Sequence, residues 1–158
     1  MSQIDEASSV DVTQKPLEIR RILMAVDKSG YKEKVISYSI ILAKALHAEL
    51  TAMHVIETST TPPGLRDFEK QYESDLEKKS QNLLDEVEIL TKKSGLKIQK
   101  KLAKSSSVSE SIINYAKKED MDFIVIGTMG MTGLEKFLMG SVANKVITHA
   151  HCTVVAVR

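Results

Sequence analysis

Four of the seven glycines in this 158-residue chain, Gly127, Gly130, Gly133 and Gly140, lie within fourteen consecutive positions, where an even distribution would place fewer than one. Glycine admits positive φ and lets a ligand approach the main-chain amides, because no Cβ is in the way. Ser141 adds a hydroxyl donor at the start of a predicted helix. Unpaired amides and the helix dipole both favour negative charge at such a point. The cluster therefore indicates a binding site for phosphate oxygens.

The spacing of the cluster distinguishes it from two other nucleotide-binding motifs. It reads G-x2-G-x9-G-S, from Gly127 through Gly130 and Gly140 to Ser141, which matches neither G-x-x-x-x-G-K-[ST] nor G-x-G-x-x-G. The P-loop and the dinucleotide-binding fingerprint are therefore excluded. A structural alternative stays open, in which the glycines only shape a long turn and cap the helix that follows.

Alternating strands and helices must position this cluster. Short apolar runs predict strands at about 22–26, 50–56, 96–102, 123–126 and 152–157. Helical spacing of apolar residues and end signals predict helices at about 31–47, 66–93, 107–118 and 140–148. This alternation implies a single-domain α/β fold with an open, mostly parallel five-stranded sheet and helices on both faces. Ligands bind such sheets beyond the carboxyl ends of the strands.

Three of the predicted elements carry further signals. Ser107 and Glu110 have the spacing of a capping box, so a helix is expected to begin there. Lys100 interrupts the apolar face of the strand at 96–102, which is typical of a strand at a sheet edge. The long helix is expected to pack through an apolar stripe made of Phe68, Tyr72, Leu76, Leu83, Val87 and Leu90.

The amino-terminal segment, residues 1–19, is predicted to be a disordered tail, and residues 20–158 form the predicted domain. The tail is rich in Ser, Thr, Gln and Asp, and it lacks the apolar stretch of a secretory signal. The longest unbroken apolar run has five residues, at 22–26, whereas a membrane span needs roughly 20. The single cysteine, Cys152, cannot form an internal disulfide. We expect a soluble cytoplasmic protein with no membrane partner.

Charge and aromatic content argue against a nucleic-acid partner. The chain has 22 Lys and Arg against 21 Asp and Glu, so it offers no long-range field to a polyanion. Three Phe, four Tyr and no Trp leave few side chains on which bases could stack. We therefore expect no nucleic-acid binding, and recognition must depend on local chemistry.

At this glycine cluster the sequence resembles the ATP-binding branch of the universal stress protein family. The resemblance covers residues 20–158, and it is densest from Asp122 to Gly127, through Gly140 to Val142, and at 154–157. It implies a Rossmann-like sheet whose five strands, numbered along the chain, lie in the order 3-2-1-4-5.

The resemblance also implies roles for residues around the base and the ribose. Asp27, at the end of the first strand, would contact the ribose or the adenine, with the backbone near Ala25 flanking the base. Val55 matches the position whose main-chain N–H and C=O hold the adenine, and Gly127 matches a ribose contact. For Asp27 an alternative stays open, in which it caps the helix that follows the strand.

The resemblance assigns the phosphates to the second half of the motif. Gly130, Gly140, Ser141 and Val142 match positions that hold the phosphates. Met129 is a candidate in the same loop, although relatives often carry a basic residue or His there. Mg²⁺ or Mn²⁺ would be held mainly through the phosphates, because no cluster of carboxylates adjoins the motif.

The histidines are weaker candidates. His54 lies in an apolar strand and is expected to be a hydrogen-bonded core residue rather than a catalyst. His149, His151 and Cys152 have metal-binding side chains, but residues two apart across a helix-to-strand junction diverge and a fourth ligand is not evident. We expect no metal site there and read Cys152 as a buried residue near a helix end.

Together with these patterns, the resemblance implies an ATP-binding stress-response protein that acts as a nucleotide-linked switch or a partner-binding module. Fast phosphoryl transfer needs a positioned base and cations, and only Glu135 and Lys136 lie near the motif. ADP or AMP could replace ATP. The apolar last strand, Cys152 to Val157, is expected to pair with a second copy in a homodimer. Two alternatives remain: a dimerisation module of the same fold without nucleotide, and a slow enzyme that hydrolyses ATP or transfers an adenylyl or phosphoryl group.

Overall fold

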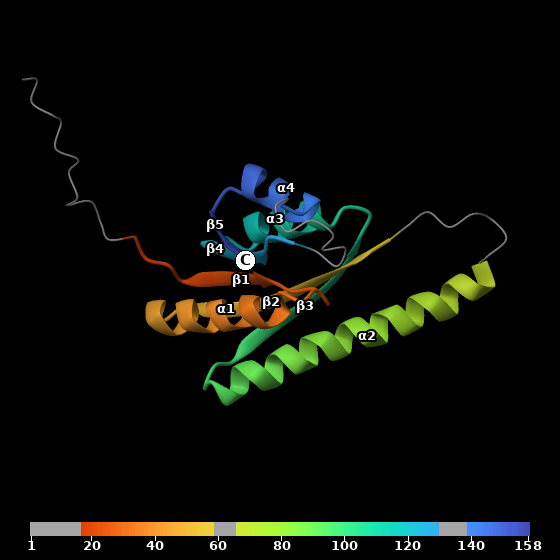
Figure 1. The fold of residues 1–158 in the computed structure, drawn as a ribbon, viewed down its shortest axis with the longest axis horizontal. Helices are drawn as coiled ribbons and strands as arrows, with labels where there is room; N and C mark the ends of the chain where they lie inside the picture. Colours follow the sequence, from red (N-terminus) through yellow and green to blue (C-terminus); the bar gives the residue numbers. More distant parts are fainter. Residues whose placement is uncertain (1–16, 59–65, 130–138) are drawn as a thin grey trace, which may run out of the picture.

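The computed structural model describes residues 17–58, 66–129 and 139–158, and within them five strands alternate with four helices (Figure 1). The strands are β1 (Arg21–Ala25), β2 (Glu49–Glu57), β3 (Ile98–Ser105), β4 (Phe123–Gly127) and β5 (Thr153–Val157). The helices are α1 (Lys32–Leu46), α2 (Arg66–Lys93), α3 (Val108–Lys118) and α4 (Ser141–His149). All strands are parallel, in the order β3-β2-β1-β4-β5, which confirms the predicted α/β class and strand order.

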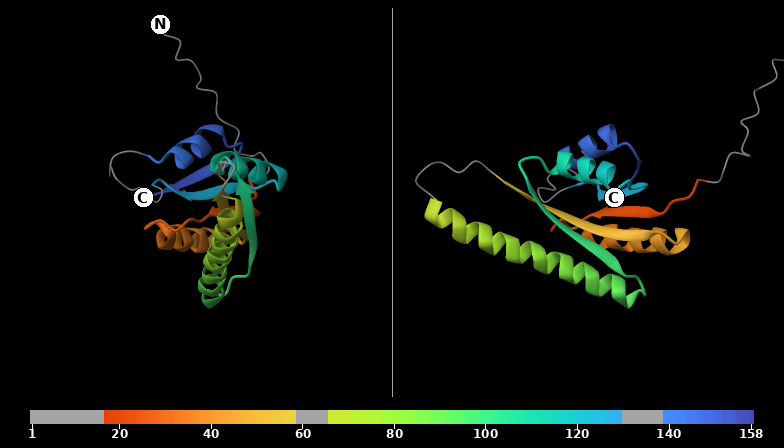
Figure 2. Two further views of the ribbon diagram at one scale, coloured as in Figure 1. Left: turned by 90° about the vertical axis from the view of Figure 1, so that its right-hand side faces the viewer. Right: turned by 180° about the vertical axis from the view of Figure 1, so that it is seen from behind.

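The helices form a layer on each face of the sheet. Helices α1 and α2 cover one face and α3 and α4 cover the other (Figures 1 and 2). The two-residue period of a strand divides β1 between these layers. Ile22 and Met24 pack with α1 and α2, whereas Leu23 packs with α3 and α4. A short, continuous apolar run is therefore what an interior strand of this sheet requires.

The capping box predicted at the start of α3 is half formed. Ser107 is the N-cap residue, and its hydroxyl accepts a hydrogen bond from Glu110 N at 3.4 Å. The reciprocal bond from Ser107 N to the Glu110 side chain is replaced by one to Ser105 Oγ, at 3.1 Å. Ser105, at the end of β3, thus supplies the acceptor for Ser107 N that the Glu110 side chain was expected to supply.

Strand β3 lies at an edge, as predicted, but it begins at Ile98 and continues to Ser105. Backbone pairing with β2 extends to the pair Glu57 and Ser105, and this pairing does not need apolar side chains. Lys100, which interrupts the apolar pattern, binds Asp85 and Glu88 of α2 at 2.9 and 2.7 Å. These hydrogen bonds lower the pKa of both carboxyl groups.

Helix α2 is longer than the sheet that it covers. Its 28 residues span about 42 Å, whereas the nine residues of β2 span about 30 Å. Its amino-terminal end therefore projects beyond the sheet (Figure 1). The predicted apolar stripe is right for Leu83 and Val87, which are buried, and wrong for Phe68, Tyr72 and Leu90, which are 79%, 68% and 40% exposed.

Two predictions about the chain as a whole meet the described residues only in part. Residues 1–16 of the predicted tail lie outside the described residues, so for them the tail stays a prediction. Ile19, the last residue of the predicted tail, packs against the core. None of the helices in the described ranges combines the length and the hydropathy that crossing a membrane would require.

Candidate functional site

Strand register brings the candidate residues to one edge of the sheet. Ala25, the last residue of β1, pairs with Met53 on one side and with Ile126 on the other. Asp27, Val55 and Gly127 therefore follow at the same edge, beyond or at the carboxyl ends of three adjacent strands. This is the edge at which open α/β sheets bind ligands.

Asp27 stabilises the turn that leaves β1. Its Oδ1 accepts a hydrogen bond from Ser29 N at 2.9 Å. The N-cap residue of α1 is Tyr31, which makes no side-chain cap bond, so the alternative that Asp27 caps this helix is wrong. In the part of the chain that the structure describes, the second carboxylate oxygen of Asp27 has no hydrogen-bond partner.

Val55 lies in the part of β2 that extends beyond the end of β1. The last paired residues are Ala25 and Met53, whereas β2 continues to Glu57 along β3. Thr58 N donates to Ser105 O, 2.9 Å away on the β3 side, and Val26 N donates to Met53 O on the β1 side. Because successive residues of a strand point their main-chain groups to alternate sides, Val55 directs its N–H and C=O toward the β1 side.

Gly127 is closely packed at the end of β4. A Cβ at this position would lie 3.2 Å from Cβ of Tyr31 and 3.6 Å from Cγ2 of Val35. The Tyr31 hydroxyl also donates to Sδ of Met129, at 3.5 Å, which joins the loop after β1 to the loop after β4. Close approach to α1 thus explains this glycine without a ligand, while its main chain stays at the candidate edge.

The start of α4 is tied to the end of β4. Gly140 N donates to Thr128 O at 2.6 Å, and Thr128 N donates to Val157 O at 2.9 Å. Gly140 is the N-cap residue, with φ of −59° and no side-chain cap bond. Its φ does not require glycine, so the expected use of positive φ is wrong here. What glycine supplies is the lack of a side chain that would accept hydrogen bonds from the amides of Val142 and Ala143.

The candidates therefore divide into those that the structure brings together and one that it does not describe. Eight of the nine predicted site residues lie at this edge: Ala25, Asp27, Val55, Gly127, Met129, Gly140, Ser141 and Val142. Gly130 lies outside the described residues, as do Gly133 and Met131. Tyr31 and Thr128 join the edge although no sequence motif marks them, because only the folded chain brings the two loops together.

Comparison with known proteins identifies the family of this chain. A sequence profile of the Universal stress protein family matches residues 18–158. Universal stress protein MJ0531 of Methanocaldococcus jannaschii is 33% identical over 141 residues, which cover 88% of this chain and 82% of that protein. This chain belongs to the universal stress protein family. Universal stress protein YxiE of Bacillus subtilis is 27% identical over 146 residues, covering 87% and 98% of the two chains.

Solved structures of universal stress proteins share the fold of this chain. Universal stress protein UspA from Lactobacillus plantarum aligns with a TM-score of 0.82 at 21% identity, over 90% of this chain and 99% of its own. A universal stress protein in complex with cAMP aligns at 0.66 and 17% identity, covering 90% and 98%. One from Archaeoglobus fulgidus in complex with dAMP aligns at 0.64 and 22%, covering 90% and 100%.

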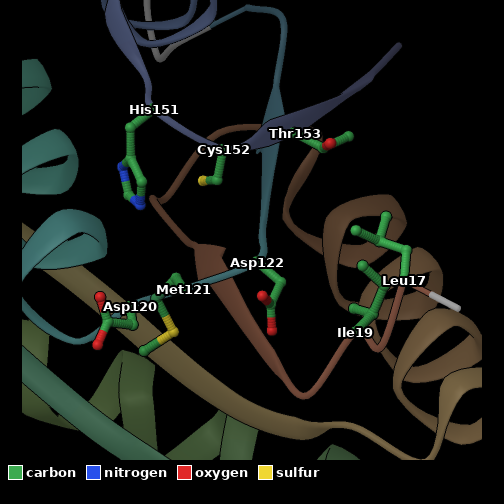
Figure 3. A pocket seen from close by; sticks show the side chains of 8 residues that line it. All are labelled: Leu17, Ile19, Asp120, Met121, Asp122, His151, Cys152 and Thr153. Carbon is green, nitrogen blue, oxygen red and sulfur yellow. The ribbon is translucent and has the colours of Figure 1, made fainter. Parts of the chain in front are cut away.

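A pocket of this universal stress protein lies at the opposite, amino-terminal edge of the sheet (Figure 3). Asp122 faces it, but its Oδ2 already accepts hydrogen bonds from Arg20 N and Arg21 N, at 2.8 and 2.9 Å. Burial raises the pKa of the Cys152 thiol, which disfavours the reactive thiolate. Within the described ranges no group of three or more His, Cys, Asp and Glu side chains could hold a metal ion. This pocket therefore offers little chemistry.

His54 has the structural role that the sequence predicted. Its Nδ1 lies 2.8 Å from Val26 O, and the side chain is partly buried. Because a carbonyl oxygen only accepts hydrogen bonds, Nδ1 carries the proton. The histidine therefore joins β2 to the residue that follows β1.

Proposed function

We propose that this universal stress protein binds an adenine nucleotide at the carboxyl edge of its sheet, with ATP as the expected ligand. The observation that carries the proposal is the start of α4, which Gly140 ties to the end of β4 and leaves without a side-chain cap. Uncapped amides at a helix start attract phosphate oxygens. The cAMP and dAMP complexes of structurally similar universal stress proteins support an adenine compound as the ligand.

Each of the nine candidate residues is proposed to contact one part of the nucleotide. The main chain of Val55 would hold the adenine, with the backbone of Ala25 beside the base. The second carboxylate oxygen of Asp27 and the main chain of Gly127 would contact the ribose. The phosphates would lie at the α4 start and the loop before it, against the amides of Ser141 and Val142 and beside Met129, Gly130 and Gly140. The amide of Gly140 itself is already bonded to Thr128 O.

Binding rather than fast catalysis is the proposed activity. The protein would act as a nucleotide-linked switch or a partner-binding module in the stress response. Transfer of a phosphoryl group needs a positioned base and cations directed at the developing charge. Mg²⁺ or Mn²⁺ would be held mainly by the phosphates. Such an ion would neutralise phosphate charge, while the chain's own amides orient the phosphates.

The proposal predicts that the purified protein binds ATP with a dissociation constant well below millimolar. Mass spectrometry of small molecules released from freshly purified protein would identify a carried ligand, and calorimetry with ATP, ADP, AMP and cAMP would rank them. Release of ADP or AMP faster than about once per minute would instead point to an enzyme, since kinases turn over at about 1–100 per second. No binding at millimolar concentrations of any of the four would overturn the proposal.

The packing of Gly127 favours one alternative function. Because the close approach of Tyr31 already disfavours a side chain there, a dimerisation module of the same fold could carry this glycine without any nucleotide. The calorimetric experiment separates the two functions, since this alternative predicts no heat of binding.

We also propose a homodimer in which two copies of β5 pair. The two outermost strands of the sheet differ in charge. Strand β3 carries Lys100, Lys101 and Lys104, whereas β5 has no charged residue between Thr153 and Val157. Charged residues, lysine above all, protect a sheet edge against pairing. The apolar β5 edge is therefore the one open to a second copy.

A lysine in β5 is expected to convert this dimer to monomer. In light scattering at micromolar concentration the protein should have twice the chain mass, and Ala156→Lys should halve it. Ala156 is exposed, so little loss of stability is expected. Gln99→Lys on the exposed β3 edge is the matched control and should stay dimeric. A monomer before any substitution, or equal effects of both lysines, would refute pairing through β5.

A further inference from the structure

The hydrogen-bond ladder between β1 and β2 ends one bond early. Val26 N donates to Met53 O at 2.9 Å. In a regular parallel ladder the next bond runs from Val55 N to Val26 O, because every second residue of β2 faces β1. Among the residues that the structure describes, this bond is missing, and Val26 is not part of the strand.

The acceptor of that missing bond is occupied by a side chain. His54 Nδ1 lies 2.8 Å from Val26 O and donates to it. The imidazole therefore satisfies the carbonyl that the next ladder bond would use. Val26 stays joined to β2 through the histidine, while Val55 N is left without its ladder partner.

On its β1 side the main chain of Val55 thus has no hydrogen-bond partner among the described residues, and its position is sheltered. The residue is 8% exposed, so it lies near the surface at the carboxyl ends of the strands without projecting from it. An unpaired main-chain N–H and C=O in such a position lose free energy unless water or a ligand satisfies them. Adenine presents a hydrogen-bond acceptor directly beside the N6 donor, which complements one residue's N–H and C=O.

We propose that His54 is a positioning residue for the adenine ring. By taking Val26 O, it keeps the ladder from closing by one more bond and holds the Val55 main chain open for the base. The inference rests on the proposed function, because it concerns the base end of that nucleotide site. It adds a residue that never touches the ligand and acts through the hydrogen bonding of its neighbour.

Replacing His54 should close the ladder. In His54→Phe the Val26 carbonyl loses its donor, so Val55 N is expected to donate to it. The amide of Val55, followed by NMR hydrogen exchange in the ligand-free protein, should then exchange at least about 10-fold more slowly, while that of Met53 changes little. Calorimetry should give at least about 10-fold weaker ATP binding, with binding of inorganic tripolyphosphate unchanged. Tripolyphosphate has no base, so it reports only the phosphate end.

Two further variants keep the test decisive if His54→Phe does not fold. His54→Asn places an amide donor near the position of Nδ1 and should restore both the fast exchange and the ATP affinity. His54→Gln displaces the donor toward the position of Nε2 and should behave like His54→Phe. Equal ATP affinities of the Asn and Gln variants would overturn the inference.

The remaining outcomes separate this inference from the proposed function. If ATP and tripolyphosphate weaken together, His54 has only a structural role and the inference is wrong, while nucleotide binding stands. If the unsubstituted protein binds ATP and all three variants bind it equally well, the inference is again wrong. If the unsubstituted protein binds no nucleotide, the proposed function fails, and the exchange of Val55 still reports whether His54 opens the ladder.

Discussion

Gly140→Asp should weaken ATP binding at least about 30-fold without lowering thermal stability. The carboxylate would lie at the N-cap position of α4, where it can accept bonds from the amides that the phosphates are proposed to use. It would also repel the phosphates: unit charges in contact near a protein surface interact by a few kcal/mol, and about 2 kcal/mol corresponds to a factor of about 30. Calorimetry gives the affinity, and thermal unfolding gives the stability.

The stability of this variant should rise slightly, because an Asp N-cap is better than a Gly N-cap by a few tenths of a kcal/mol. The φ of −59° at Gly140 is a backbone conformation that Asp and Asn adopt without strain. Gly140→Asn is the control of matched shape without the charge, and it should lose clearly less affinity than Gly140→Asp. Unchanged ATP affinity in the Asp variant would remove the start of α4 from the proposed site.

Leu84→Ala should lower the free energy of unfolding by about 2–5 kcal/mol. Leu84 is 1% exposed and packs in the core between the sheet and the layer of α1 and α2. Truncating such a side chain removes apolar burial and leaves a cavity. Urea unfolding followed by circular dichroism measures the change, and the slope with urea should stay constant if the native fold is kept.

Phe68→Ala, on the same helix, is the matched control and should change the free energy of unfolding by no more than about 0.5 kcal/mol. Phe68 is 79% exposed, because α2 projects past the sheet at that point. Phe68→Ala removes a larger side chain than Leu84→Ala does, so burial and not size accounts for the expected difference. If Phe68→Ala lowered the free energy of unfolding more than Leu84→Ala, the assignment of the buried face of α2 would be wrong.

The sequence determined the elements and their class because local signals dominate there. The apolar run at 22–26 predicted a strand covered on both faces, and the structure has that strand at Arg21–Ala25. The alternation of strands and helices implied a parallel sheet. Capping residues marked the start of α3. The glycine spacing from Gly127 to Gly140 pointed to the carboxyl edge and, through its resemblance to a family, to the strand order.

Only the tertiary structure decided how residues far apart in the chain share space. Periodicity placed Phe68 and Leu83 on one stripe, but the length of the sheet decides which of them is buried. Gly127 was read as a ligand contact, and its exclusion of a side chain follows from the approach of Tyr31. The hydrogen bond between His54 Nδ1 and Val26 O joins two strands, and nothing in the local sequence predicts it. Local patterns specify elements, whereas contacts across the sheet depend on register and on where each strand stops.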